Sequence, residues 1–103
     1  MSGCRSHFVE ATIDNQGSTP LRLVEVDYPS ASFGVQDLEA GAQYRYRFKI
    51  QGSGNVTIAF TDSLGKVHSV TGPELREGQE GTLRVIVGPA GAVQFEPKLN
   101  NPH

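Results

Sequence analysis

The stretch that decides the fold is AQYRYRFKIQ, residues 42–51, in which apolar and polar side chains alternate without a break. The apolar positions are Ala42, Tyr44, Tyr46, Phe48 and Ile50, and the polar positions are Gln43, Arg45, Arg47, Lys49 and Gln51. A β-strand points successive side chains to opposite sides, so the stretch predicts a half-buried strand with an aromatic inner face and a cationic outer face. We therefore expect Tyr44, Tyr46 and Phe48 to be core residues.

The segments that follow show the same period of two. The glycine-rich turn QGSGN leads into NVTIAFTD, residues 55–62, and the turn DSLG leads into KVHSVT, residues 66–71. These segments predict a three-stranded meander in which the strands at 42–51 and 55–62 form a hairpin. In the DSLG turn we expect Asp62 to hydrogen-bond its own turn and Gly65 to adopt a positive φ.

Further strands are predicted on both sides of this meander. Upstream, HFVEATIDN (7–15) and LRLVEVDY (21–28) alternate, and PSASFGV (29–35) adds an edge segment because Pro29 cannot donate to a central ladder. The alternation shifts phase near Leu23 and Val24, which indicates a β-bulge there or a stretch that is covered on both faces. Downstream, GPELREGQEG (72–81) is predicted as a loop, and GTLRVIVG (81–88) and AVQFEP (92–97) as a hairpin joined by GPAG.

The composition agrees with this pattern. The chain has 103 residues, which suits one compact domain, and its twelve glycines and six prolines indicate many turns between short segments. About seven or eight short strands predict an all-β fold, an antiparallel β-sandwich. We expect an N-terminal extension at 1–5, a single sandwich domain at 6–97 and a C-terminal tail at 98–103.

The segment DLEAGAQYRYRF resembles the turn and following strand of fibronectin type III and other immunoglobulin-like sandwiches. The resemblance implies an immunoglobulin-like fold in which Leu38 plugs the end of the core, Gly41 makes the turn and Tyr44 hydrogen-bonds back across it as a corner tyrosine. The chain departs from fibronectin type III because several candidate strands follow this one. More loosely, the run from residue 13 to residue 88 looks like small uncharacterised bacterial proteins with one such domain behind an export signal.

The single cysteine lies in MSGCRS at the start of the chain. Met1 to Cys4 resemble the end of a bacterial lipobox, in which an apolar residue and two small residues precede the cysteine. The resemblance implies lipidation at Cys4 and attachment to a membrane through the acyl chains. Arg5 is not the aspartate that would favour retention in the inner membrane. The alternative is that Met1 is the natural start and Cys4 is a free thiol.

No catalytic, metal or cofactor motif is present in the sequence. The three histidines, His7, His68 and His103, have neither a histidine nor a cysteine at metal-ligand spacing, so we expect no metal and no cofactor. The glutamates at 74, 77 and 80 lack the alternating ligands and central glycine of a calcium loop. The formal net charge of −2 argues against nucleic acid as a partner, since phosphate binding needs a positive excess.

One feature stands out as a candidate binding surface, and we name Arg45, Arg47 and Lys49 the cationic row. Beside an outward face of small side chains at 55–61, this row could receive an anionic glycan or the acidic edge of a partner protein. Two alternatives are structural. The row could keep the sheet soluble and discourage edge aggregation, or it could pair across strands with Glu25 and Asp27.

These observations favour a non-enzymatic structural or interaction module of an exported bacterial protein, periplasmic or attached to the outer membrane. One alternative is a binding module for an anionic glycan or an acidic partner through the cationic row. A further alternative is a small hydrolase or metal-binding protein, and the alternative location is the cytoplasm.

Overall fold

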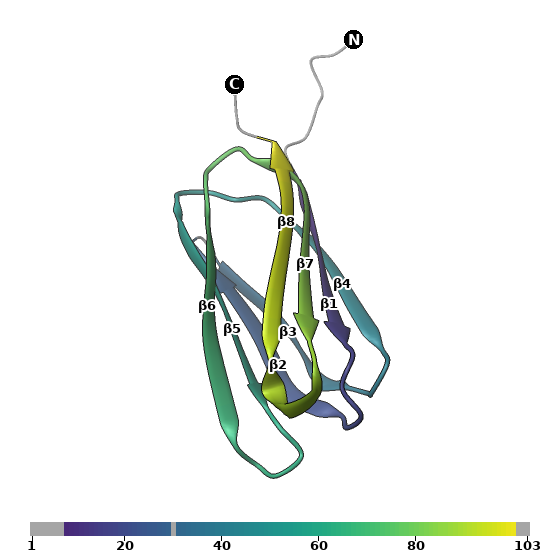
Figure 1. Ribbon diagram of the computed structural model, residues 1–103. Coiled ribbons are helices and arrows are strands. Elements are labelled where there is room, and N and C mark those ends of the chain that lie inside the picture. Colours follow the sequence, from purple (N-terminus) through teal and green to yellow (C-terminus); the bar gives the residue numbers. More distant parts are fainter. Residues whose placement is uncertain (1–7, 30, 101–103) are drawn as a thin grey trace.

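The computed structural model describes residues 8–29 and 31–100, and within these ranges the chain forms eight strands in two four-stranded sheets (Figure 1). The strands are β1 (Val9–Asn15), β2 (Leu21–Tyr28), β3 (Ala31–Leu38), β4 (Gln43–Phe48), β5 (Gly54–Thr61), β6 (Val67–Leu75), β7 (Glu80–Val87) and β8 (Val93–Asn100). A short 3₁₀ turn, η1 (Pro89–Gly91), joins the last two strands. Inward side chains of both sheets share one hydrophobic core, so the predicted all-β sandwich is confirmed.

The strand order is β4-β1-β7-β8 in the first sheet and β3-β2-β5-β6 in the second. Neighbouring strands are antiparallel except for β1 and β7, which run parallel with Val9 opposite Gly81. The chain crosses between the sheets several times between these two strands, and the last crossing brings β7 back beside β1 in the same direction. The predicted β7–β8 hairpin is confirmed, with Val87 opposite Val93.

The predicted hairpin between residues 42–51 and 55–62 is wrong, because β4 and β5 lie in different sheets. Ile50, between the two strands, is only 2% exposed and belongs to the hydrophobic core. The segment that resembles a glycine-rich hairpin turn is therefore a crossing between sheets that buries an apolar side chain on the way. The meander is reduced to the antiparallel pair of β5 and β6.

The inner face of β4 follows the predicted phase, but its three aromatic residues differ in burial. Phe48 is 4% exposed and lies in the core, whereas Tyr44 is half-buried and packs against the core. Tyr46 is 39% exposed, so its prediction as a core residue is wrong. β4 is an edge strand of its sheet, and an inward side chain on an edge strand has a neighbouring strand on one side only.

The β-bulge predicted near Leu23 and Val24 is confirmed. The pairing of β2 with β5 shifts by one residue between Arg22 and Glu25. Leu23 has a φ of 51°, a left-handed conformation that is uncommon for leucine, and its side chain is 65% exposed. The bulge turns Leu23 outward and returns Val24 and Val26 to the core, which explains the shift of phase in the sequence.

Two boundaries differ from the prediction because strands run further than expected. β6 extends to Leu75, which is fully buried, so residues 72–75 belong to a strand and the loop is shorter. β8 extends to Asn100 opposite Glu80, so residues 98–100 are not a tail. The predicted edge segment at 29–35 corresponds to β3, the last strand of the second sheet. Residues 1–5 and 101–103 lie outside the described residues.

Candidate functional site

The cationic row lies on the outer face of the sandwich. Arg45 and Arg47 occupy alternate positions of β4, and Lys49 follows directly after the strand. All three side chains are exposed, because the inward positions between them face the second sheet. The sequence therefore predicted correctly that these three residues are exposed.

The neighbours of the cationic row differ from those predicted. In the register of β1 with β4, Thr12 lies opposite Arg45 and Glu10 opposite Arg47. The predicted pairing with Glu25 and Asp27 is wrong, because β2 belongs to the other sheet. For the same reason the outward residues 55–61 do not lie beside the row.

Within the described residues, no member of the cationic row forms an ion pair within 4.0 Å. Arg47 and Lys49 instead approach the ring of Phe8, with the guanidinium carbon 5.5 Å and the ammonium nitrogen 5.2 Å from its centroid. Such cation–π contacts orient the side chains without neutralising their charge. Arg45 and Arg47 thus keep their guanidinium hydrogen-bonding groups available.

Arg84, on the same face of the sheet, differs from the cationic row because it is ion-paired. Its guanidinium lies 2.6 Å from the carboxylate of Asp14 and 3.8 Å from that of Glu96. Hydrogen bonds from Gln16 and then from Arg84 hold the pKa of Asp14 below its ordinary value. This group is a structural cluster at the centre of the sheet, in contrast to the cationic row at its edge.

Aromatic side chains line the rim beside the cationic row, between the edge strands of the two sheets. Tyr46 stacks on Phe33 of β3 with centroids 4.5 Å apart, and Tyr44 lies further along at 6.4 Å from the same ring. Tyr28 and Phe48 continue the cluster inward with centroids 4.1 Å apart. The rim of β4 is therefore cationic on its outer side and aromatic on its inner side.

The corner implied for Tyr44 is held by another residue. Within the described residues the Tyr44 hydroxyl makes no hydrogen bond, whereas the buried amide of Asn15 donates to the carbonyls of Leu38 at 3.0 Å and Glu39 at 3.2 Å. The same amide nitrogen donates to a carbonyl in the β1–β2 loop at 3.0 Å. The backbone N–H of Gly41, which has a φ of 79°, donates to the carbonyl of Asn15.

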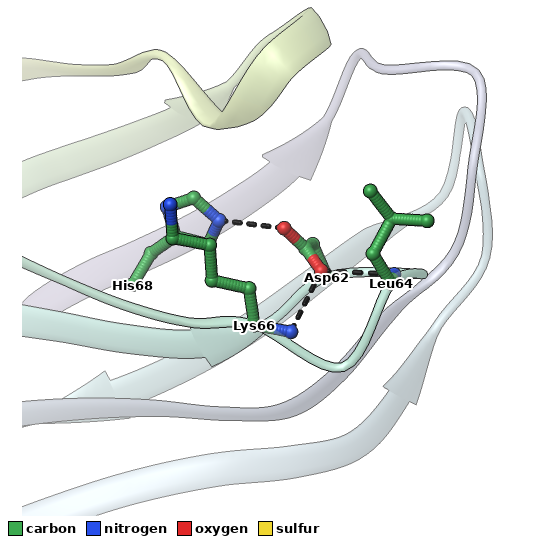
Figure 2. Close-up of polar contacts among 4 residues, drawn as sticks. All are labelled: Asp62, Leu64, Lys66 and His68. Atoms are coloured by element: carbon green, nitrogen blue, oxygen red, sulfur yellow. Dashed lines mark hydrogen bonds and ion pairs between the residues drawn. The ribbon is translucent and has the colours of Figure 1, made fainter.

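A second polar constellation lies at the end of the sandwich, around the β5–β6 turn (Figure 2). One carboxylate oxygen of Asp62 accepts hydrogen bonds from the backbone N–H groups of Leu64 and Lys66, both at 2.9 Å. The other oxygen lies 2.8 Å from Nε2 of His68. The hydrogen bond from His68, and then those from Lys66 and Leu64, lower the pKa of Asp62. The sequence predicted the turn contact of Asp62 and the positive φ of Gly65, which is 82°.

The contact with His68 was missed by sequence reasoning. Its ring stacks on Phe60 with centroids 4.9 Å apart, and a Cβ on Gly91 of η1 would approach the ring to 3.0 Å. This end of the sandwich holds a pocket of about 430 Å³ that is also lined by Ser18 and Ser63. The available signal was the even spacing of Asp62 and His68 on a single hairpin, which places both side chains on the same face.

Two kinds of feature are absent from the described part of the chain. No group of three or more histidine, cysteine, aspartate and glutamate side chains is arranged to hold a metal ion there. No helix in that part is both long enough and apolar enough to cross a membrane. His7, His103 and Cys4, the candidate lipidation site, lie outside the described residues.

Comparison with known proteins supports the fold and identifies no activity. No protein-family model matches the chain, and no curated protein matches it. Among solved structures, the chain is similar to an NMR structure of a protein from Eubacterium rectale, with a TM-score of 0.64 and 13% sequence identity. The match covers 93% of this chain and 91% of the other. At this identity the likeness shows a shared architecture alone.

Proposed function

We propose that this domain is a non-enzymatic interaction module that binds an anionic partner through the cationic row of Arg45, Arg47 and Lys49. The observation that carries the proposal is that these three exposed cations form no ion pair among the described residues. Two of them are arginines, whose planar guanidinium groups bind carboxylate or sulfate groups with paired hydrogen bonds. An acidic glycan and an acidic protein segment both carry such groups.

The non-enzymatic part of the proposal is supported by the way Asp62 and His68 are used. Both oxygens of Asp62 are committed, one to the turn and the other to His68. In a catalytic pair the aspartate orients the histidine so that the other ring nitrogen accepts a proton from a nucleophile. Among the described residues, no hydrogen bond joins His68 to Ser18 or Ser63. We assign the pair to the stability of the β5–β6 hairpin.

We further propose that the domain acts outside the cytoplasm, in the periplasm or at the outer membrane, anchored by lipidation at Cys4. The support is the resemblance of Met1 to Cys4 to a lipobox. Mass spectrometry of the protein produced from its complete gene should find a diacylated N-terminal cysteine. A mature N-terminus at Met1 with an unmodified thiol would contradict export and support a cytoplasmic location.

The binding proposal is tested by replacing the cationic row with glutamine at all three positions. Retention on immobilised heparin or polyglutamate at low salt should be lost, because the charges that attract the matrix are removed. Wild-type retention should fall as salt is raised, since the Debye length is about 8 Å at physiological ionic strength.

The matched control replaces Arg22, Lys66 and Arg76, which lie outside β4, with glutamine, and it removes the same charge. Arg22 lies on β2 and the other two lie in turns. The control variant should be retained like the wild type, and both variants should keep the wild-type melting temperature. Equal loss from both variants, or no wild-type retention above background, would contradict a specific anionic site and favour the structural role of the row.

A further inference from the structure

β4 is the edge of its sheet and is open to another strand. It pairs with β1 on one side, and no strand of the described chain pairs with its other side (Figure 1). An edge strand presents unpaired N–H and C=O groups that form a template for an incoming strand. With six residues, β4 is as long as a typical strand.

The other edges are less suitable as templates. β6 and β8 contain Pro73 and Pro97, which lack the N–H that a ladder requires. β3 has no proline, but its one charged residue, Asp37, already lies 4.0 Å from Arg22 of the neighbouring strand β2, and its other exposed polar residues, Ser32 and Gln36, carry no charge. Among the four edges in the described residues, β4 combines an uninterrupted backbone with charged outward positions that form no ion pair.

The side chains of β4 alternate in a way that specifies what could lie beside them. Arg45 and Arg47 point outward, and Tyr46 between them points inward at the rim. Tyr46 stacks on Phe33 and keeps 39% of its surface exposed. Lys49 continues the outward row beyond the end of the strand.

We propose that the partner is an extended protein segment that adds to the free edge of β4 and carries acidic residues alternating with apolar ones. Its acidic side chains lie beside Arg45 and Arg47, and its apolar side chain covers Tyr46. Its backbone completes the ladder of β4, as in other cases of strand addition. This inference rests on the proposed function and names the partner class of the same surface.

A strand fits this rim better than a glycan does. A glycan on the outer face reaches the cationic row, but the free backbone groups and the inward-facing Tyr46 lie at the edge. An added strand contacts all three features, because its side chains alternate between the two faces of the sheet. The exposed tyrosine ring and the charged row then belong to one binding surface.

The test uses a capped six-residue peptide of alternating glutamate and valine, matched to the length of β4. A second peptide has the same sequence but is N-methylated at every other residue, which removes backbone donors and keeps the charge. Titration should show that the unmodified peptide binds at least about tenfold more tightly. NMR of the complex should show contacts between the peptide and β4, with new hydrogen-exchange protection of β4 amides.

Charge reversal provides a check that does not depend on loss of binding alone. Arg45→Glu together with Arg47→Glu should abolish binding of the glutamate peptide and create binding of a lysine–valine peptide. Equal affinity for the N-methylated and unmodified peptides would overturn strand addition and leave an anionic site intact. Binding of heparin but of neither peptide would identify a glycan site. If no acidic probe binds in a way that depends on the cationic row, the proposed function fails as well.

Discussion

The ring of Tyr46 on β4 stacks on the ring of Phe33 on β3, with centroids 4.5 Å and planes 14° apart. This contact joins the edge strands of the two sheets, which have no backbone hydrogen bonds in common. One rim of the sandwich is thus closed by side chains alone. Tyr46 is the more exposed ring of this pair, so it leaves an aromatic surface beside the cationic row.

Phe48 and Tyr46 of β4 should therefore differ in their effect on stability. Phe48→Ala should lower the free energy of unfolding by about 3–5 kcal/mol, since it empties a buried site. Tyr46→Ala should cost less, about 2 kcal/mol, because the ring stays 39% exposed and its stacking on Phe33 adds only about 1 kcal/mol to the partial burial. Urea denaturation of both variants measures the difference. Equal losses would show that Tyr46 is a core residue after all.

Asn15→Ala should destabilise the fold by about 1–3 kcal/mol, because it leaves the carbonyls of Leu38 and Glu39 without their donor. Asn15→Asp should cost more at neutral pH, since a carboxylate would face the same carbonyls. The matched control is Asn55→Ala, whose amide donates to a single carbonyl at an exposed position. A loss no greater at Asn15 than at Asn55 would contradict the role of Asn15 in holding the corner.

Acid should weaken the fold partly through Asp62, whose pKa lies below its ordinary value of 3.8. Above the unfolded-state pKa the group contributes its full stabilisation, and the contribution is lost as pH falls through the lower folded-state pKa. Asp62→Asn should therefore be less stable than the wild type at neutral pH and show a shallower loss of stability below about pH 4. Melting temperatures across this range measure the effect.

Asp27→Asn serves as the control for Asp62. Asp27 is exposed and makes no ion pair among the described residues. Its replacement should leave the acid limb of the stability curve parallel to that of the wild type. Parallel curves for Asp62→Asn as well would show that the hydrogen bonds to Leu64, Lys66 and His68 do not stabilise the carboxylate.

Leu23→Asn should stabilise the domain by about 0.5–1 kcal/mol. Leu23 has a φ of 51°, which asparagine tolerates better than leucine, and its side chain is 65% exposed, so little burial is lost. Val67→Asn is the matched control, because Val67 is 69% exposed but has no positive φ. It should be neutral or destabilising, since valine suits a strand better. Stabilisation by both changes would mean that exposure, and not strain, explains the result at Leu23.

The period of two in the sequence determined where most of each strand lies and which of its sides faces inward, but it missed the strand residues 72–75 and 98–100. It predicted the burial of Phe48, the outward orientation of Arg45 and Arg47, and the bulge at Leu23, because each depends on local alternation alone. The turn chemistry of Asp62 was predictable for the same reason, since its backbone partners lie within four residues.

Only the tertiary structure decided which strands are neighbours. Backbone hydrogen bonds between strands are the same for nearly every residue, so the ladder itself does not identify its partner. The choice depends on where the chain crosses between sheets, as it does around the buried Ile50, and on packing of the whole core. For this reason the alternation alone led to the wrong prediction that the cationic row lies beside β5. In the folded protein the row lies at a free edge, next to β1 and to Tyr46, which is 39% exposed.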